Sequence, residues 1–236
     1  MDQVKKLYLI PSDIGHIPDD GIFNKEQREI VFSLKQFIVE KAKTARHFLK
    51  ESGFPHEMRS VEMLEFNEHN RAESMPEIKQ FLQISESIGL MSEAGLPCVA
   101  DPGHEVVALA HELGYEIVPF YGPSSIMMAL MASGFSGQQF VFHGYLPAKT
   151  PQKRSALKKL GQRMQREKYT QIFMETPYRS NAMIEDMIAV LPGETKLCVA
   201  AEINTPEEFI KTKSLNLWSR SRPDLHKKRC IFLLGS

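Results

Sequence analysis

The feature that most constrains the fold is a strand–loop–helix–strand pattern over residues 88–120. Two short apolar runs, at 88–92 and 115–120, flank a helical segment at 104–113, and Gly114 follows that segment directly. The runs are bounded by Gly, Pro or Ser, as is typical of strands buried on both faces. Apolar residues recur at helical spacing between them, and a glycine stands where helices commonly end. The pattern predicts the βαβ unit of a parallel sheet.

Similar alternation continues along the rest of the chain. Residues 7–10 predict a first strand, and residues 124–133 predict a helix that begins at serines. Further strand-like runs lie at 140–143, 170–174, 196–201 and 230–234, with helical segments at 152–168 and 180–191. The sequence therefore predicts an α/β fold of two α/β domains, over residues 1–120 and 121–236. We expect a fixed cleft between them, and such clefts favour ligand sites.

Composition excludes several classes of protein. The chain has 29 Lys and Arg against 29 Asp and Glu, so its formal net charge is zero and any nucleic-acid contact must be local. The sequence shows neither an apolar run of membrane-spanning length nor the features of a signal peptide. Cys98, Cys198 and Cys230 lack the spacing of a zinc site or a disulfide framework. We expect a protein of the reducing cytoplasm, with no metal and no membrane contact.

Two loops are candidates for ligand binding. Residues 92–103 (SEAGLPCVADPG) follow a predicted buried strand and combine two glycines with two prolines. Residues 121–125 (YGPSS) follow the next predicted strand and place hydroxyl groups at a helix N-terminus. Open α/β sheets bind ligands at the carboxyl ends of their strands, and we expect the two loops to end adjacent strands. The alternatives are an ordinary βα connection and simple helix capping.

The chain contains neither GxGxxG nor GxxxxGK[ST], so nucleotide binding of the Rossmann or P-loop kind is unsupported. Residues 88–149 instead resemble the tetrapyrrole methylase superfamily and, more narrowly, its ribosomal RNA small-subunit (cytidine-2′-O-)methyltransferase branch. That branch reads S-D-A-G-T-P, S-D-P-G, P-G-P-S and G-F-L-P-x-K, which here match residues 92–97, 100–103, 122–124 and 144–149. Further similarities lie at 7–20, 66–78, 173–180 and 199–218. The chain departs from the branch at 40–43, where EKAK replaces E-D-T-R, and in SEAGLP itself.

The resemblance implies two α/β domains, a homodimer, and S-adenosylmethionine bound in the interdomain cleft. This cofactor is an activated sulfonium, so the protein's main task is positioning, and no metal is required. Carried over by motif, the cofactor-binding residues are Pro11, Gly95, Leu96, Pro97, Val99, Ser124, Ser125 and Ile126, with Met174 and Ala201 from the second domain.

Methylation of a ribose 2′-hydroxyl requires a proton acceptor, normally His or a carboxylate. The candidate catalytic cluster is Glu68, His69 and Asn70, with Glu175 and Glu202 as further candidates. A solvated surface segment is the alternative for each of them.

Basic residues concentrate at 149–168, where eight Lys and Arg stand against Glu167 alone, and a second basic run lies at 227–229. Such asymmetry favours phosphate contacts, although a solvated helix is the alternative. Tyr145 and Tyr178 are candidates for stacking on a flipped base, with core packing as the alternative. The candidate substrate-binding residues are Lys149, Arg154, Glu175, Arg179 and Glu202.

These features together predict an S-adenosylmethionine-dependent methyltransferase that 2′-O-methylates a ribosomal RNA nucleotide. One alternative keeps the cofactor and changes the acceptor to a small molecule, such as a tetrapyrrole, or to a protein. Another is a non-catalytic module that binds the cofactor or RNA.

Overall fold

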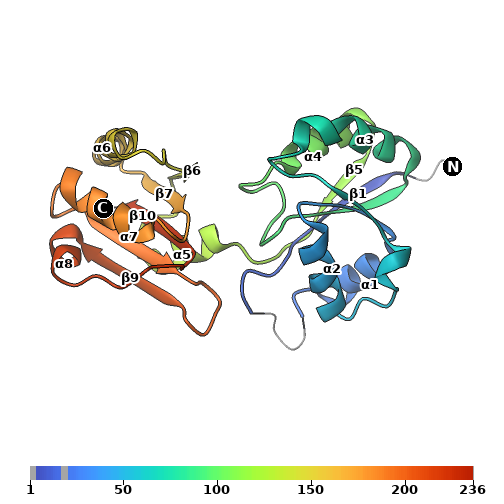
Figure 1. Cartoon of the computed structure of the whole chain (residues 1–236), viewed down its shortest axis with the longest axis horizontal. Helices are drawn as coiled ribbons and strands as arrows, with labels where there is room; N and C mark the ends of the chain where they lie inside the picture. Colours follow the sequence, from blue (N-terminus) through green and yellow to red (C-terminus); the bar gives the residue numbers. More distant parts are fainter. Residues whose placement is uncertain (1–3, 17–20, 236) are drawn as a thin grey trace. The chain divides into compact units, whose positions relative to one another are not determined.

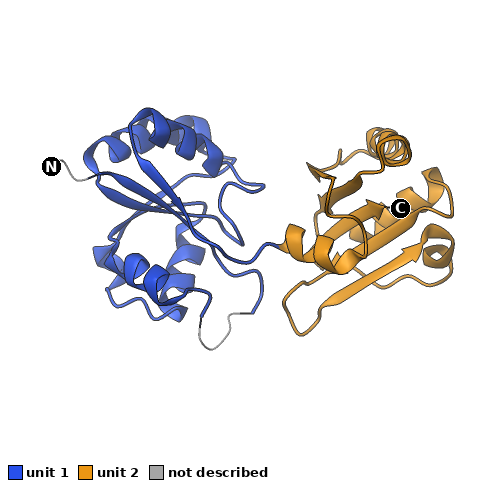
Figure 2. Ribbon diagram, turned by 180° about the vertical axis from the view of Figure 1, so that it is seen from behind, with its two compact units in different colours: residues 1–124 blue, residues 125–236 orange. Residues whose placement is uncertain are grey.

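The computed structural model describes residues 4–16 and 21–235, which form two compact units, Met1–Ser124 and Ser125–Ser236 (Figures 1 and 2). The end of the motif-bearing segment 7–20, at residues 17–20, lies outside the described residues. The division falls within the YGPSS loop, because Ser125 is the first residue of helix α5 (Ser125–Ser133). Within the described residues, no helix is both long and apolar enough to cross a membrane.

Unit 1 contains a five-stranded sheet in the order β3-β2-β4-β1-β5, and every pairing in it is parallel. Side chains alternate between its faces: Phe37 and Val39 pack in one hydrophobic cluster and Ile38 in the other. Helices α1 and α2 cover the first face, and α3 and α4 cover the second (Figure 1). The strands are β1 (Lys6–Ile10), β2 (Gln36–Val39), β3 (Glu62–Glu65), β4 (Ser87–Met91) and β5 (Glu116–Pro119). The helices are α1 (Lys25–Ser33), α2 (Ala42–Glu51), α3 (Arg71–Ile84) and α4 (Gly103–Glu112), with a 3-10 turn at Met58–Ser60.

The predicted βαβ unit is present as β4-α4-β5, but its two strands are not neighbours. Strand β1 lies between them, and Leu7 is paired with Ile88 on one side and Ile117 on the other. The expectation that the SEAGLP and YGPSS loops end adjacent strands is therefore wrong. Because all five strands are parallel, their carboxyl ends share one edge of the sheet, and the end of β1 lies between the two loops.

Unit 2 contains a mixed five-stranded sheet in the order β6-β7-β10-β8-β9. The last strand of the chain, β10, is central and runs antiparallel to both β7 and β8. Every residue of β10 is buried, as its continuous apolar sequence predicts. The strands are β6 (Phe140–Tyr145), β7 (Thr170–Glu175), β8 (Lys196–Ala201), β9 (Phe209–Ser214) and β10 (Cys230–Gly235).

The helices of unit 2 lie on both faces of its sheet. Leu157, Met183 and Trp218 belong to one buried cluster, so α6, α7 and α8 share a face. Helix α5 packs on β8, β9 and β10 without contributing to that cluster. Besides α5, the helices are α6 (Thr150–Glu167), α7 (Ser180–Val190) and α8 (Leu215–Arg220). Strands β7 and β8 flank β10 in the same direction, so their carboxyl ends lie at one edge, beside the start of β10.

Candidate functional site

The loops that follow β1 and β4 are joined by hydrogen bonds at the carboxyl edge of the unit 1 sheet. The Ser12 N–H donates to the Gly95 carbonyl at 2.9 Å, and the Gly95 N–H donates back to the Ser12 carbonyl at 3.2 Å. The buried Ser12 hydroxyl donates to the Ser92 carbonyl at 2.9 Å, and the Ser92 hydroxyl donates to the Gly95 carbonyl at 3.2 Å. The SEAGLP loop is therefore held against the end of β1 by backbone and side chain together.

The loop after β5 approaches the same place through glycine. A Cβ atom on Gly122 would lie 2.3 Å from Cβ of Pro11, so only glycine allows this approach. Gly95 has a φ of +77°, and a Cβ on it would lie 3.3 Å from the Pro123 carbonyl oxygen. The Leu96 side chain also lies near the position that a Cβ atom on Gly122 would occupy. The structure thus brings Pro11, Gly95 and Leu96, three of the predicted cofactor-binding residues, into one cluster.

The second half of the SEAGLPCVADPG loop is organised around Asp101. The Asp101 carboxylate accepts the N–H of Cys98 at 2.9 Å and that of Gly103 at 2.6 Å. Burial raises the pKa of Asp101 despite these donors, and burial together with Asp101 raises the pKa of Cys98 to about 12. Cys98 and Ala100 have φ values of 69° and 67°, a conformation that non-glycine residues adopt at some energetic cost. Between them, Val99 is 45% exposed.

This cluster fits the cofactor that the resemblance implies. It offers the exposed residues Ala94, Val99 and Ala100, and two glycines at which an added Cβ atom would meet the neighbouring loops. Backbone amides and apolar side chains suit an adenine ring and a methionine chain. In unit 1 the residues that would hold it are Pro11, Gly95, Leu96, Pro97, Val99 and Ser124.

The remaining predicted cofactor-binding residues lie on unit 2. Ser125 and the buried Ile126 begin α5. Met174 is in β7 and pairs with Ile231, and Ala201 ends β8 and pairs with Cys230. Met174 and Ala201 therefore flank the first residues of β10 at one edge of the sheet.

The predicted catalytic cluster occupies the turn between β3 and α3. The Asn70 side chain holds this turn, because its Oδ1 accepts the Asn67 N–H at 2.8 Å and its Nδ2 donates to the Glu65 carbonyl at 3.1 Å. Glu68 and His69 are exposed, and Glu68 lies 3.5 Å from the Arg71 guanidinium. Asn70 thus has a structural role, and Glu68 and His69 remain the candidates of this cluster for proton transfer.

Sequence reasoning missed Glu40, which follows β2 directly. Its Oε2 accepts the N–H of Glu93, in the SEAGLP loop, at 2.7 Å. Burial raises the pKa of Glu40, and the neighbouring carboxylates of Asp101, Glu93 and Glu68 raise it further. Glu40 is therefore a carboxyl group of increased basicity in contact with the candidate cofactor loop. The available signal was a carboxylate placed at the carboxyl end of the apolar run FIV.

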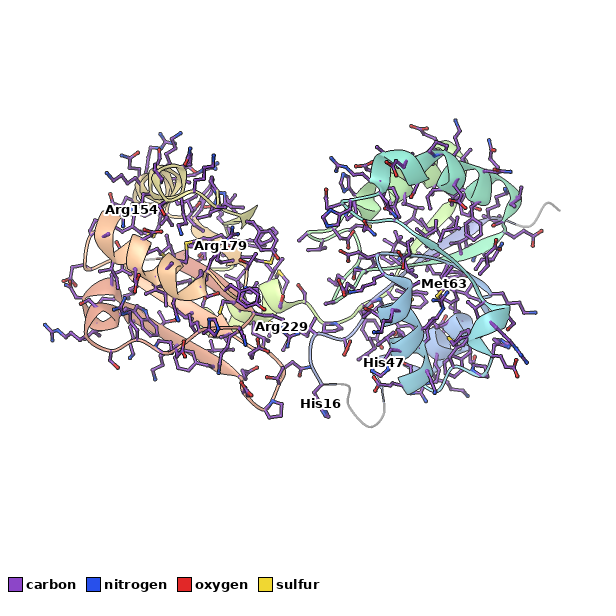
Figure 3. All side chains as sticks on the ribbon, in the orientation of Figure 1. His16, His47, Met63, Arg154, Arg179 and Arg229 are labelled. Carbon is purple, nitrogen blue, oxygen red and sulfur yellow. The ribbon has the colours of Figure 1, made fainter. Side chains whose placement is uncertain are left out.

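Three of the predicted substrate-binding residues gather at the edge of unit 2. Glu175 ends β7 and is buried; its Oε1 accepts from Nε and Nη2 of Arg179 at 2.8 and 2.6 Å. Its Oε2 is buried and has no hydrogen-bond partner among the described residues. Glu202 follows β8 and pairs with Arg229, whose Nη2 lies 2.7 Å from Oε2 of Glu202. Figure 3 labels Arg229 and Arg179, the basic partners of Glu202 and Glu175. Burial favours the neutral acid, but the hydrogen bonds and charge of Arg229 outweigh it and lower the pKa of Glu202.

The other two predicted substrate-binding residues lie at and near the start of α6. Lys149 is exposed, whereas Arg154 donates to Oδ1 of Asp186, on α7, at 2.7 Å. Lys153 is only 3% exposed and lies 2.7 Å from the other Asp186 oxygen. These ion pairs tie α6 to α7, so part of the basic sequence at 149–168 stabilises the fold.

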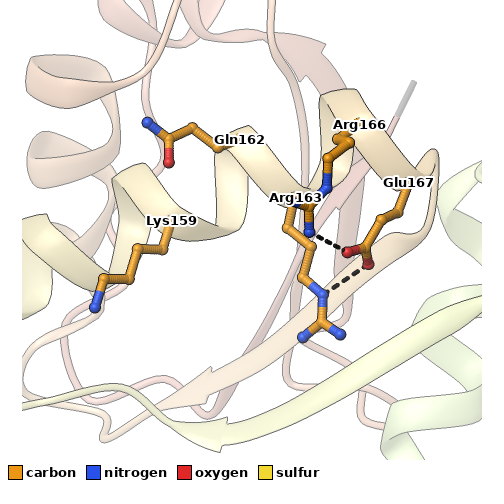
Figure 4. Close-up of a pocket in the computed structure, with 5 residues that line it drawn as sticks. All are labelled: Lys159, Gln162, Arg163, Arg166 and Glu167. Atoms are coloured by element: carbon orange, nitrogen blue, oxygen red, sulfur yellow. Dashed lines mark hydrogen bonds and ion pairs between the residues drawn. The ribbon is translucent and has the colours of Figure 1, made fainter.

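The other face of α6 presents its charges to solvent. Lys158, Lys159, Arg163 and Arg166 are exposed. A hollow of about 360 Å³ is lined by Lys159, Gln162, Arg163, Arg166 and Glu167 (Figure 4). Glu167 accepts from Arg163 at 2.7 Å and from Arg166 at 2.6 Å, and these bonds lower its pKa. This face remains strongly basic after that pairing.

Charge divides sharply between the two units although the chain is neutral overall. Unit 1 has 12 Lys and Arg against 20 Asp and Glu, and unit 2 has 17 against 9. The formal charges are therefore −8 and +8. A polyanionic ligand would be attracted to unit 2.

Comparison with known proteins gives consistent matches across the chain. Residues 27–216 match the family model described as Tetrapyrrole (Corrin/Porphyrin) Methylases. Two relatives, both named Ribosomal RNA small subunit methyltransferase I, are 31% identical over 232 residues. The protein from Pseudomonas aeruginosa matches over 97% of this chain and 78% of its own length, and the one from Bacillus subtilis over 98% and 75%.

Two solved structures share the fold. The crystal structure of the methyltransferase CobJ superposes with a TM-score of 0.61 at 16% identity, over 98% of this chain and 94% of that one. A conserved hypothetical protein from Aeropyrum pernix K1 superposes with a TM-score of 0.66 at 13% identity, over 100% and 85%. At these identities the likeness concerns the fold alone.

Proposed function

This chain belongs to the tetrapyrrole (corrin/porphyrin) methylase family and is an S-adenosylmethionine-dependent methyltransferase, and we propose that its acceptor is a ribose 2′-hydroxyl of small-subunit ribosomal RNA. The observation that carries this proposal is 31% identity, over 97% of the chain, to a relative named Ribosomal RNA small subunit methyltransferase I. The +8 charge of unit 2 supports an RNA acceptor, because phosphate contacts dominate RNA affinity.

The three joined loops of unit 1 bind and orient the methyl donor. Bound S-adenosylmethionine supplies a methyl group on an activated sulfonium. The bonds between Ser12 and Gly95, and the contact of Gly122 with Pro11, fix the positions of these loops before the ligand arrives. Such preorganisation contributes to the rate because the reacting groups need no further alignment.

Methylation of a hydroxyl group releases a proton, and the chain must accept it. The Glu40 carboxylate suits this role because one oxygen is held by the Glu93 N–H while burial and neighbouring acids increase its basicity. Glu68 and His69 are the alternative acceptors in the same unit.

The exposed basic face of α6, together with Lys149, supplies phosphate contacts for the RNA. Arg179, Glu175 and Glu202 lie at the edge of the unit 2 sheet, where we expect them to contact the acceptor nucleotide. The protein acts as a cytoplasmic homodimer in this proposal, as the family resemblance implies. The likeness to CobJ, at 16% identity, gives no support to a tetrapyrrole acceptor.

An acceptor assay tests the proposal. The chain is incubated with S-adenosylmethionine carrying a labelled methyl group, in parallel with small ribosomal subunits, their naked RNA, a tetrapyrrole mixture and ribosomal protein. We expect label in the RNA, and S-adenosylhomocysteine as competitor should abolish it. Label confined to the tetrapyrrole or protein fraction would overturn the RNA acceptor while preserving the methyltransferase assignment.

A further inference from the structure

We propose that Tyr178, His226 and Lys227 form a nucleotide-binding site on unit 2, which stacks an unpaired base on Tyr178 and binds the adjacent phosphate at Lys227. This inference rests on the proposed RNA acceptor and adds a contact site away from α6. The features that support it are an exposed aromatic ring, the charges beside that ring, and the hollow that those charges line.

The aromatic part of the site is held by two loops. Tyr178 follows β7 and is 72% exposed. Its ring centroid lies 5.9 Å from that of His226, with the two planes at 70°. The Lys227 N–H donates to the Pro177 carbonyl at 3.0 Å and thereby joins the loop before β10 to the loop after β7. A large ring that is positioned by its neighbour, yet mostly exposed, is the platform on which single-stranded RNA stacks its bases.

The cationic part of the site is Lys227. Its neighbours in the basic run are already paired: Lys228 lies 3.3 Å from Glu207, and Arg229 lies 2.7 Å from Glu202. Lys227 is exposed and makes no ion pair within the part of the chain that the structure describes. Within this basic run, a phosphate can therefore bind the Lys227 ammonium group without displacing a carboxylate.

A hollow of about 500 Å³ adjoins these residues and is lined by Glu202, Thr205, Pro206, Glu207 and His226 through Arg229. Glu202, Asn204 and Lys227 have φ values of 48°, 63° and 61°, and left-handed conformations of non-glycine residues concentrate at ligand sites. The carboxylates of Glu202 and Glu207 disfavour a phosphate inside the hollow, so the phosphate belongs at its Lys227 rim. A nucleotide carries a base next to a phosphate, and this site has an aromatic ring next to a lysine. An inorganic anion would bind Lys227 without contacting Tyr178.

The chemistry selects single-stranded RNA over a duplex. Bases in a duplex are stacked on each other and do not present a face to a protein side chain. The ligand class is thus an unpaired segment of RNA, in which one nucleotide contacts Tyr178 and its phosphate contacts Lys227.

Fluorescence anisotropy with a single-stranded RNA oligonucleotide from the small subunit tests the site in the full chain. At each of three salt concentrations, Tyr178→Ala should weaken binding by about 5- to 150-fold, the range for loss of one stacked base. Tyr178→Phe keeps the ring and should bind within about twofold of the unchanged chain. Lys227→Gln should lower the log–log salt slope by about 0.7, for one lost phosphate contact.

An abasic oligonucleotide of the same length separates stacking from structural damage. Tyr178→Ala should bind it like the unchanged chain, because no base is present to stack. Lys158→Gln with Lys159→Gln, on α6, is the matched control, and it should lower the slope equally for both oligonucleotides. If the unchanged chain binds RNA but Tyr178→Ala and Lys227→Gln bind identically to it, the site is wrong and the RNA acceptor stands. Absence of RNA binding by the unchanged chain would overturn both.

Discussion

The Glu93 N–H donates a 2.7 Å hydrogen bond to Oε2 of Glu40, and so joins the SEAGLP loop to the end of β2. The bond spans 53 residues of sequence and holds the Glu40 carboxyl group, whose pKa is raised, against the candidate cofactor loop. Ala42, two residues further on, donates its N–H to Oε1 of Glu65 at 2.7 Å. The loops at the carboxyl edge of unit 1 are therefore held partly by carboxylate–amide hydrogen bonds.

Replacement of Glu40 by Gln tests the proton acceptor. The amide oxygen still accepts the Glu93 N–H, so affinity for S-adenosylmethionine should stay within about twofold, whereas the methyl-transfer rate should fall by about 10²–10⁴. In the unchanged protein the rate should rise with pH through the raised pKa of Glu40, because only the ionised carboxylate accepts a proton. In single-turnover measurements, the methyl-transfer rate of the variant should not show this rise with pH. A full rate in Glu40→Gln, together with a loss in His69→Gln, would assign the role to the β3–α3 turn.

Gly122→Ala tests the close approach of the loops. The new Cβ would lie 2.3 Å from Pro11, so the loops must separate at a cost of about 1–3 kcal/mol. Affinity for S-adenosylmethionine, measured by calorimetry, should fall at least tenfold. Gly114→Ala is the control, because Gly114 has a φ of +76° but no neighbour within 4 Å. It should lower stability and preserve cofactor affinity; equal affinity losses in both variants would argue against a cofactor role for these loops.

The basic face of α6 should determine the salt dependence of RNA binding. Replacement of Lys158, Lys159, Arg163 and Arg166 by Gln should lower the log–log slope by about 0.7 for each lost phosphate contact. Lys153 is excluded from this variant because it is buried against Asp186. Affinity for S-adenosylmethionine should not change. An unchanged slope over three salt concentrations would show that RNA does not contact this face.

The ion pairs of the buried Asp186 carboxylate should contribute to stability. Lys153→Met removes one partner of the buried Asp186 carboxylate. Loss of the sole partner of a buried charge lowers the free energy of unfolding by about 3–5 kcal/mol. The loss here should be smaller, because Arg154 still pairs with Asp186. Burial opposes ionisation, but Lys153 and Arg154 lower the pKa of Asp186. The ionised Asp186 carboxylate thus makes its full contribution to the free energy of unfolding above the unfolded-state pKa of about 3.9. This contribution is lost as the pH falls through the lower pKa of the folded state. Urea unfolding of Asp186→Asn should lack this acid dependence; an identical dependence in both proteins would contradict the assignment.

Much of the fold follows from local patterns. The segments over 88–133 were predicted nearly to the residue, because each combines a continuous apolar pattern with Gly, Pro or Ser at its ends. The segments α1–α3, β2, β3, β9 and α8 were not predicted. Strand β3, for example, lies at the sheet edge and reads EMLE, with two exposed glutamates. Strand order was also beyond local reasoning: β1 separates β4 from β5, and β10 is central although it ends the chain.

The site was predictable where residues are neighbours in sequence and unpredictable where they meet in space. The glycines of SEAGLP and YGPSS marked loops that do contact the end of β1. The importance of Glu40 depends on Glu93, far along the chain, so no local pattern indicates it. Lys153 is one of the eight basic residues from which the sequence predicts phosphate contacts at 149–168, and a charge tally cannot show that its side chain pairs with Asp186 of α7.

Methyl transfer to a ribose oxygen of small-subunit ribosomal RNA is the reaction that we propose for this chain. The most direct test is mass spectrometry of nucleosides after the chain has acted on small ribosomal subunits with S-adenosylmethionine carrying a deuterated methyl group. We predict a deuterium-labelled 2′-O-methylnucleoside that is absent when the chain is omitted and strongly reduced with Glu40→Gln. Label on a base instead of the ribose, or RNA without label while S-adenosylmethionine binds normally, would contradict it.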